Sequence, residues 1–355
     1  ALLDRLALDP ERVEAMAVGL EAIVELPDPV GEVIAERRIQ QDVELEQVRV
    51  PIGVVAIVYE ARPNVTIDAA ALCLKSGNAA VLRGSSSAAA SNAVLAGIFS
   101  EAIEAAGLPS GSLELVAGGG REELGELARQ SEYIDLIIPR GGEGLKNALK
   151  EVAEVPVLYA AGGNCHVYVH ADADPAMAGP IVMNAKVQRP GVCNSLETLL
   201  VHEDIAAELL PATLRELHDA GVELVGDHAA RELAGDVAIG TATDLDWATE
   251  YHAMKMAVRV VASAEEAIEH VNTWGTGHSE AIVTASAEVG RQFTTGVDAA
   301  CVYVNASIRF TDGFVFGMGA EIGNSTQKLH ARGPIGLREL TSYKYVLHGT
   351  GQVRE

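Results

Sequence analysis

The fold is decided by residues 51–84, which read PIGVVAIVYEARPNVTIDAAALCLKSGNAAVLRG. Residues 51–60 contain an apolar run of strand length, residues 67–76 have the apolar spacing of a helix, and residues 78–84 form a second short apolar run. A strand, a helix and a strand in this order predict a βαβ unit, because two parallel strands must be joined by a crossover connection.

The same alternation continues on both sides of this stretch. Residues 9–25 are predicted to form a helix that opens with Asp9-Pro10, and residues 38–50 alternate like an exposed hairpin. We expect further helices at 88–106, 122–130, 141–153, 174–187, 204–221, 263–274 and 286–296, and further strands within 107–118, 133–139, 156–163, 165–170, 197–202, 222–226, 256–261, 280–285 and 300–305. This pattern predicts an α/β protein with two doubly wound domains.

The charge balance narrows the kinds of partner. The chain has 355 residues, of which 26 are basic and 50 are acidic, for a formal net charge of −24. Such a chain repels nucleic acids and anionic membranes, so neither is an expected partner. It has no apolar run long enough to span a membrane and no signal-peptide pattern at its start, so we expect a cytoplasmic protein with free thiols.

The sequence offers one candidate phosphate-binding turn. No P-loop occurs, and the glycine string at 317–323 does not follow a strand, so a substrate loop is the better interpretation of it. Arg140-Gly141-Gly142 follows a predicted strand and opens a predicted helix. Free backbone N–H groups at a helix start, together with an arginine, suit a pyrophosphate, and an ordinary glycine-rich turn is the alternative.

Among the four cysteines, Cys193 is the best-placed nucleophile. It lies in the loop QRPGVCN, residues 188–194, where glycine and proline can present a thiol to a cleft and Arg189 would favour the thiolate. Cys73 and Cys301 lie on apolar faces, and Cys165-His166 is expected to be a buried strand pair with no metal-binding role. On this pattern alone, a structural thiol is an equal alternative for Cys193.

Several long segments resemble the γ-glutamyl phosphate reductases (glutamate-5-semialdehyde dehydrogenases) of the aldehyde dehydrogenase superfamily. The resemblance covers about residues 3–346. Its most specific strings are residues 50–84, IPRGGEGL (138–145), NAKVQRPGVCNSLETLLV (184–201), YVNASIRFTDGFVFGMGAEI (303–322) and STQKLHARGPIGLRELTSYKYV (325–346). It implies an aldehyde dehydrogenase-like α/β fold. The family usually has a further helical N-terminal stretch, so we expect the sequence to be truncated at that end.

The resemblance implies a nucleophile and its partners. Cys193 matches the family's nucleophile, and Asn64 matches the asparagine whose amide helps to form the oxyanion hole. Arg189 and Arg309 are the candidates for holding the substrate phosphate or α-carboxylate. A salt bridge with Asp312 is the alternative role of Arg309.

The resemblance also implies a nicotinamide cofactor site. Arg83 matches a basic residue that lies over the adenosine ribose, Arg140-Gly141-Gly142 falls at the cofactor-phosphate turn, and Glu250 matches the glutamate that holds the nicotinamide ribose. Ser85 and Ser86 follow Arg83, and Ser86 stands where many NAD-preferring relatives carry a glutamate. A guanidinium without that carboxylate suits the 2′-phosphate of NADPH.

One departure from the wider superfamily indicates the reaction. Oxidising aldehyde dehydrogenases carry a glutamate before a Gly-Gly pair, as the base that activates water. Here Ala160-Ala161 precedes Gly162-Gly163, and a methyl group cannot accept a proton, so water attack loses about 10²–10⁴-fold. We therefore expect a Cys193 thioester that survives for phosphate exchange. The expected reaction is the NADPH-dependent reduction of L-glutamyl 5-phosphate to L-glutamate 5-semialdehyde and phosphate, in proline biosynthesis.

The resemblance finally implies a domain plan. Residues 1–37 and 51–163 would form the NADP-binding domain, 164–335 the catalytic domain, and 38–50 with 336–355 a small β oligomerisation flap. A homodimer or homotetramer is expected, with glutamate 5-kinase as a further candidate partner. Two alternatives stay open: another acylating, non-hydrolytic enzyme that uses acyl-CoA or a different acyl phosphate, and a catalytically inactive binding module.

Overall fold

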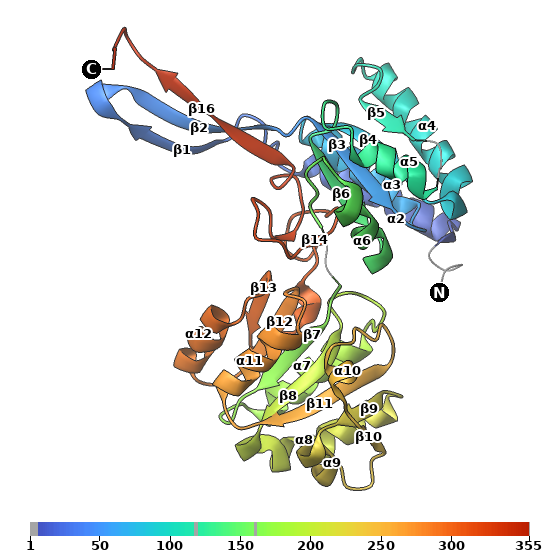
Figure 1. The fold of residues 1–355 in the computed structure, drawn as a ribbon, viewed down its shortest axis with the longest axis vertical. Helices are drawn as coiled ribbons and strands as arrows, with labels where there is room; N and C mark the ends of the chain where they lie inside the picture. Colours follow the sequence, from blue (N-terminus) through green and yellow to red (C-terminus); the bar gives the residue numbers. More distant parts are fainter. Residues whose placement is uncertain (1–5, 117–119, 160–161, 355) are drawn as a thin grey trace. The chain divides into compact units, whose positions relative to one another are not determined.

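The chain forms two compact units, Ala1–Ala160 with Gly313–Glu355, and Ala161–Asp312 (Figure 1). The structure, a computed structural model, describes residues 6–116, 120–159 and 162–354. In these ranges, no helix combines the length and the apolar character needed to cross a membrane.

The first unit contains a parallel sheet in the order β5-β4-β3-β6. Its strands are β3 (Val54–Tyr59), β4 (Ala79–Arg83), β5 (Leu113–Leu115) and β6 (Leu136–Arg140), and its helices are α2 (Pro10–Glu25), α3 (Asn64–Lys75), α4 (Ala89–Ala105), α5 (Arg121–Ala128) and α6 (Glu143–Val152), with a 3-10 turn η2 (Ser86–Ala88). Side chains alternate along β3. Ile57 packs in one cluster with Leu72 of α3, and Val58 packs in another with Leu149 of α6. Helices therefore cover both faces of this sheet.

An antiparallel three-stranded sheet completes the first unit. It has the order β1-β2-β16 and is formed by β1 (Val33–Arg38), β2 (Glu44–Pro51) and β16 (Thr341–His348), with a turn η1 (Gln40–Asp42) between the first two strands (Figure 1). Tyr343, Tyr345 and Leu347 of β16 are exposed. A short pair, β14 (Asn324–Ser325) and β15 (Gly333–Pro334), precedes β16.

The second unit contains a parallel sheet in the order β10-β9-β11-β8-β7-β12-β13. The strands are β7 (Cys165–Val169), β8 (Leu196–His202), β9 (Glu223–Gly226), β10 (Ile239–Thr241), β11 (Lys255–Val261), β12 (Ser279–Val283) and β13 (Cys301–Val304). The helices are α7 (Pro175–Val187), α8 (Glu203–Asp219), α9 (His228–Leu233), α10 (Asp244–Trp247), α11 (Ala264–Trp274) and α12 (Ala287–Gly296), followed by a 3-10 turn η3 (Ile308–Phe310).

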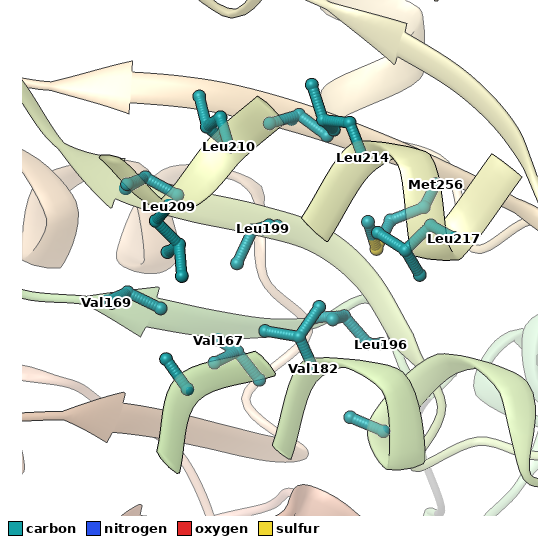
Figure 2. Packing of buried hydrophobic residues seen from close by; sticks show 14 of the residues in the cluster. Val167, Val169, Val182, Leu196, Leu199, Leu209, Leu210, Leu214, Leu217 and Met256 are labelled. Carbon is teal, nitrogen blue, oxygen red and sulfur yellow. The ribbon is translucent and has the colours of Figure 1, made fainter. Parts of the chain in front are cut away.

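Alternation along the central strands explains why helices cover both faces of this second sheet. Val167 of β7 packs with Val182 of α7 and Leu214 of α8, whereas the next residue, Tyr168, packs with Phe293 of α12. Figure 2 shows the first of these clusters, in which Leu210, Leu214 and Leu217 of α8 follow one another at intervals of four and three residues along one face of the helix. Burial on both faces accounts for the continuous apolar runs of these strands.

The prediction of an α/β protein with two doubly wound sheets is confirmed, while the start of one helix and the presence of one strand were predicted wrongly. The helix predicted at 67–76 begins at Asn64. The strand predicted at 156–163 is absent from its described part, where only Val157 bridges to Ile137. The boundary between the units also differs from the predicted plan, because residues 313–335 belong to the first unit.

Candidate active site

Asn64 is the first residue of α3, at the carboxyl edge of the first sheet, and its side chain is exposed. Its amide Nδ2 donates a hydrogen bond to Asp68 Oδ2 at 3.0 Å, one helical turn later. Burial raises the pKa of the Asp68 carboxyl, while the bond from Asn64 and the charge of Arg140 lower it. Since the amide nitrogen carries two hydrogens, this bond orients the group and leaves a second N–H to act as a donor.

The predicted adenosine contacts lie at the end of β4. Arg83 is the last residue of that strand, and its Nη2 donates to the Gly120 carbonyl at 2.9 Å. Ser85 Oγ accepts the backbone N–H of Ala61 at 3.1 Å, which ties this turn to the segment that follows β3. Ser86 begins the turn η2. The three predicted residues therefore lie together at the carboxyl edge of the sheet.

The glycine turn after β6 has the expected helix-start geometry, but a carboxylate already lies there. The Gly142 N–H donates to Glu60 Oε2 at 3.1 Å, and a Cβ on Gly141 would lie 2.8 Å from the same oxygen. The Arg140 side chain packs against Gly323, where a Cβ would lie 2.5 Å from Nη1. A cofactor phosphate that binds the Gly142 N–H would therefore have to displace Glu60.

Cys193 is exposed in the loop between α7 and β8 of the second unit. Two neighbours hold its backbone: Cys165 Sγ donates to the Cys193 carbonyl at 3.2 Å, and a Cβ added to Gly163 would overlap that carbonyl oxygen. The next residue, Asn194, donates through Nδ2 to the Thr311 carbonyl at 2.8 Å. A backbone held in place, with an exposed thiol side chain, suits a nucleophile. As predicted, Cys73, Cys165 and Cys301 are buried.

Glu250 lies beside the Gly162-Gly163 pair. A Cβ on Gly162 would lie 2.6 Å from Glu250 Oε2, the oxygen that also contacts His252 Nε2 at 3.2 Å. The hydrogen bond to Glu250 raises the pKa of the half-exposed His252, against the opposing effect of burial. Glu250 Oε1 is buried and has no hydrogen-bond partner among the described residues. This oxygen is therefore placed to accept a hydrogen bond from a ligand.

A fully buried ion pair supports the same region. Lys186 Nζ of α7 lies 2.8 Å from Glu197 Oε2 of β8, and neither side chain is exposed. Glu197 Oε1 also accepts the His252 backbone N–H at 3.4 Å. Burial raises the pKa of Glu197 to about 7 and lowers the pKa of Lys186. The pair thus links the helix before the Cys193 loop to the segment that carries His252.

Arg189 and Arg309 carry positive charge close to the Cys193 loop. Burial and the charge of Arg189 lower the pKa of Arg309, whereas the charges of Cys193 and Asp312 raise it. Arg309 Nε donates to Gln188 Oε1 at 3.0 Å, while Asp312 acts on it through charge. The structure therefore brings two guanidinium groups to the loop of the predicted nucleophile.

The predicted site residues fall into two groups, one in each unit. Asn64, Arg83, Ser85, Ser86, Arg140, Gly141 and Gly142 lie at the carboxyl edge of the first sheet, and Cys193, Arg189 and Glu250 lie at the amino edge of the second. Arg309 follows β13, and its hydrogen bond to Gln188 brings it to the Cys193 loop. Ala160 and Ala161, the position of the missing water-activating base, lie outside the described residues. No group of three or more His, Cys, Asp or Glu residues within the described ranges is placed to hold a metal ion.

Several groups that the structure places in or beside the site were not predicted from the sequence. They are Glu60, Asp68, Lys186, Glu197 and His252. Asp68 had a detectable signal, because residues i and i+4 meet on a helix once the helix is known to begin at Asn64. The others meet the site only through tertiary contacts.

Comparison with known proteins adds a family to this geometry. The sequence profile of the Aldehyde dehydrogenase family matches residues 11–254. The chain is 55% identical over 354 residues to a γ-glutamyl phosphate reductase of Heliobacterium modesticaldum and 53% identical over 355 residues to that of Moorella thermoacetica, covering 84% of each. It is 48% identical to the crystal structure of a γ-glutamyl phosphate reductase from Thermotoga maritima, with a TM-score of 0.97, and covers 85% of that chain.

Proposed function

Because the chain belongs to the γ-glutamyl phosphate reductases of the aldehyde dehydrogenase family, we propose that it reduces L-glutamyl 5-phosphate to L-glutamate 5-semialdehyde with NADPH, through a thioester on Cys193. Membership makes it a nicotinamide-dependent oxidoreductase of proline biosynthesis. The observation that carries the thioester is the exposed Cys193 side chain on a backbone that Gly163 and Cys165 hold in place.

The chain's own residues would divide the chemistry as follows. Cys193 Sγ forms a bond to the acyl carbon, and the bond from that carbon to the phosphate oxygen breaks. Asn64 Nδ2 and the Cys193 N–H donate to the carbonyl oxygen as it gains charge; losing one such donor typically costs about 3–4 kcal/mol. Arg189 and Arg309 offset the charge of the departing phosphate. After reduction of the thioester, the thiolate leaves and the aldehyde is released.

The residues present fit a nicotinamide cofactor. The buried, unpartnered Glu250 Oε1 suits a hydroxyl donor of the nicotinamide ribose. Arg83, Ser85 and Ser86 at the end of β4 offer a guanidinium and hydroxyls, with no carboxylate among them, to the 2′-phosphate of NADPH. When bound, NADPH supplies the hydride. We assign the carboxyl edge of the first sheet to the cofactor and the second unit to the nucleophile.

The absence of a general base at Ala160 supports reduction rather than hydrolysis of the thioester. The further assignments are a cytoplasmic location, a homodimer or homotetramer joined through residues 38–50 and 336–355, and glutamate 5-kinase as a partner. The exposed Tyr343, Tyr345 and Leu347 on β16 support the oligomer, because apolar strand faces are usually covered.

The test is the reverse reaction with L-glutamate 5-semialdehyde, NADP⁺ and inorganic phosphate, and its rate is measured as the formation of NADPH. We expect turnover that requires phosphate and disappears in Cys193→Ala. Turnover that needs coenzyme A would support another acylating enzyme. Turnover that needs neither phosphate nor coenzyme A would support a hydrolytic enzyme. No turnover, together with a Cys193 that alkylates no faster than Cys73 or Cys301, would support an inactive binding module.

A further inference from the structure

Arg140 is assigned to the cofactor phosphates only by its place at the turn after β6, and its surroundings suggest another ligand. It ends β6 in the first unit, packs against Gly323, and has a buried Nε with no hydrogen-bond partner among the described residues. The Asp68 carboxylate acts on it through charge, but among the described residues no direct ion pair joins the two side chains. In a chain with 50 acidic residues, an arginine in this state indicates a site for an anion from outside.

Asn324, next to Gly323, is a second group without a partner. Its side chain is 4% exposed, and neither Oδ1 nor Nδ2 has a hydrogen-bond partner in the described part of the chain. Burial of an amide with both ends unpaired is unfavourable, so such groups usually bind a ligand or water. It lies one residue from the glycine that the Arg140 guanidinium contacts.

Asp68 provides the opposite charge on the same side of the sheet. It lies one turn into α3, accepts the Asn64 amide at 3.0 Å, and interacts electrostatically with Arg140. Since no ion pair joins the carboxylate and the guanidinium among the described residues, each can still bind the opposite charge of a ligand that carries both charges. An α-amino acid is such a ligand, because its ammonium and carboxylate are attached to one carbon.

We propose that Arg140, Asn324 and Asp68 form the pocket for the α-amino-acid end of the substrate. Arg140 donates two N–H groups to the α-carboxylate, the Asn324 amide donates to the same carboxylate, and Asp68 accepts hydrogen bonds from the α-ammonium. This assignment rests on the proposed function, since it needs a substrate that carries an amino-acid end. It moves Arg140 from the cofactor to the substrate and leaves Arg189 and Arg309 for the phosphate.

The neighbouring residues fit this assignment. Asn64, the donor proposed for the reacting carbonyl, is bonded to Asp68, the acceptor proposed for the ammonium. In a glutamyl group, three carbon–carbon bonds separate the α-carbon from the reacting carbonyl carbon. The two recognition groups therefore lie on adjacent turns of α3, which matches a short substrate that carries both functions.

The test uses L-norvaline, which has the amino-acid end and chain length of the semialdehyde but no aldehyde. Calorimetric titration of the whole protein, with and without NADP⁺, is compared with D-norvaline and with pentanoate, which lacks the ammonium. We expect L-norvaline to bind more tightly than either. Arg140→Gln and Asn324→Ala should each weaken its binding by about 10–100-fold, the usual effect of losing a charged hydrogen bond. Arg140→Lys should lose less.

Matched controls separate binding from folding. Arg129→Gln and Asn147→Ala remove the same groups from exposed positions and should leave binding unchanged. Asn324→Ala removes an amide that has no partner, so its melting temperature should not fall. Asp68→Asn should weaken L-norvaline but not pentanoate.

Three outcomes would overturn the proposal: no binding of L-norvaline by the wild type, equal affinity for L-norvaline and pentanoate, or variants that weaken NADP⁺ instead. The last outcome would return Arg140 to the cofactor. The proposed function fails separately, through loss of phosphate-dependent turnover in a protein that still binds L-norvaline.

Discussion

The two parallel sheets of this protein are built alike but carry their candidate functional residues at opposite ends of their strands. In the first unit, Arg83 and Arg140 end strands β4 and β6, and Asn64 opens the helix that follows β3. In the second unit, Cys193 precedes β8, and Glu250 lies before β11. Ligands of open α/β sheets usually bind at the carboxyl ends of the strands. The first unit follows this rule, and the second does not.

The difference separates binding from bond formation. At a carboxyl end the chain enters helices, whose first N–H groups are free to bind anions. At the amino end of the second sheet the chain arrives from a helix, and what it presents is a loop fixed by packing: Gly163 and Cys165 hold the Cys193 carbonyl, and Lys186 and Glu197 lie buried beneath. One edge is suited to recognition, and the other to holding a nucleophile rigidly.

The largest effect expected from this division is that of Cys193→Ser. The serine hydroxyl is a far weaker nucleophile, so kcat should fall by at least about 10⁴-fold in the phosphate-dependent assay. Because Cys193 is not among the residues assigned to the cofactor, the affinity for NADP⁺, measured by fluorescence titration, should not change. A joint loss of turnover and cofactor affinity would erase the distinction between the two edges.

The next effect concerns the buried pair of the second unit. Lys186→Met leaves Glu197 buried without its cation, and such changes typically cost about 3–5 kcal/mol of stability. Burial already raises the pKa of Glu197 to about 7 from its usual 4.5, so its folded form favours the proton. The protonated Glu197 carboxyl therefore contributes stability that is complete below its unfolded pKa near 4.5, and this stability is lost as pH rises through the folded pKa of about 7. Denaturant unfolding should therefore show the larger loss at pH 8 than at pH 5.

The double change Lys186→Met with Glu197→Leu is the control, because it removes both charges and keeps the volume. It should recover most of the stability lost in the single variant. If Lys186→Met alone were as stable as the wild type at pH 8, the pair would not support the nucleophile loop.

A smaller effect is expected from Gly163→Ala. The added methyl would overlap the Cys193 carbonyl oxygen, and overpacking of this kind costs about 1–3 kcal/mol of stability. The backbone of Cys193 must then shift to relieve the overlap, which displaces the nucleophile. We expect a clear fall in kcat together with only a small fall in the melting temperature. Gly179→Ala in α7, where an added Cβ meets nothing within 4 Å, is the matched control: it should leave kcat unchanged and should not lower the melting temperature. Equal behaviour of the two variants would contradict the tight contact.

The smallest expected effect is a pKa change at His252. Its bond to Glu250 raises its pKa, so the stability it contributes is complete below its unfolded value near 6.5 and is lost as pH rises through the folded pKa. Glu250→Gln should lower the pKa of His252, as seen in NMR titration of the imidazole. An unchanged titration curve would mean that the bond does not form in solution.

Most of the fold could be predicted from the sequence, because strands buried on both faces are continuous apolar runs, as in residues 54–59. The start of α3 could not be placed by apolar periodicity, since Asn64 is exposed and lies before the first periodic residue. The short strand-like run at 156–159 follows an apolar pattern without finding a full partner strand. Periodicity marks which residues are buried, not how many hydrogen bonds a segment obtains.

For the candidate site, the sequence indicated groups that act locally and missed those that act through space. Cys193 stood out by its loop, and its role came from family resemblance. Arg140 and Gly323 are far apart in sequence and meet only because β6 ends beside the loop before β14. Lys186 and Glu197 lie on a helix and a strand whose packing sets their distance. No local pattern encodes such pairs.

The route of the chain has a consequence for how the protein is made on the ribosome. Strand β2 pairs with β16, and Arg49 donates to the Arg338 carbonyl across 289 residues of sequence. The second unit, Ala161–Asp312, is synthesised between these partners. It can therefore fold while the first unit still waits for its last strand. During translation, β2 is an open edge, and a neighbouring nascent chain could pair with it before its own β16 emerges.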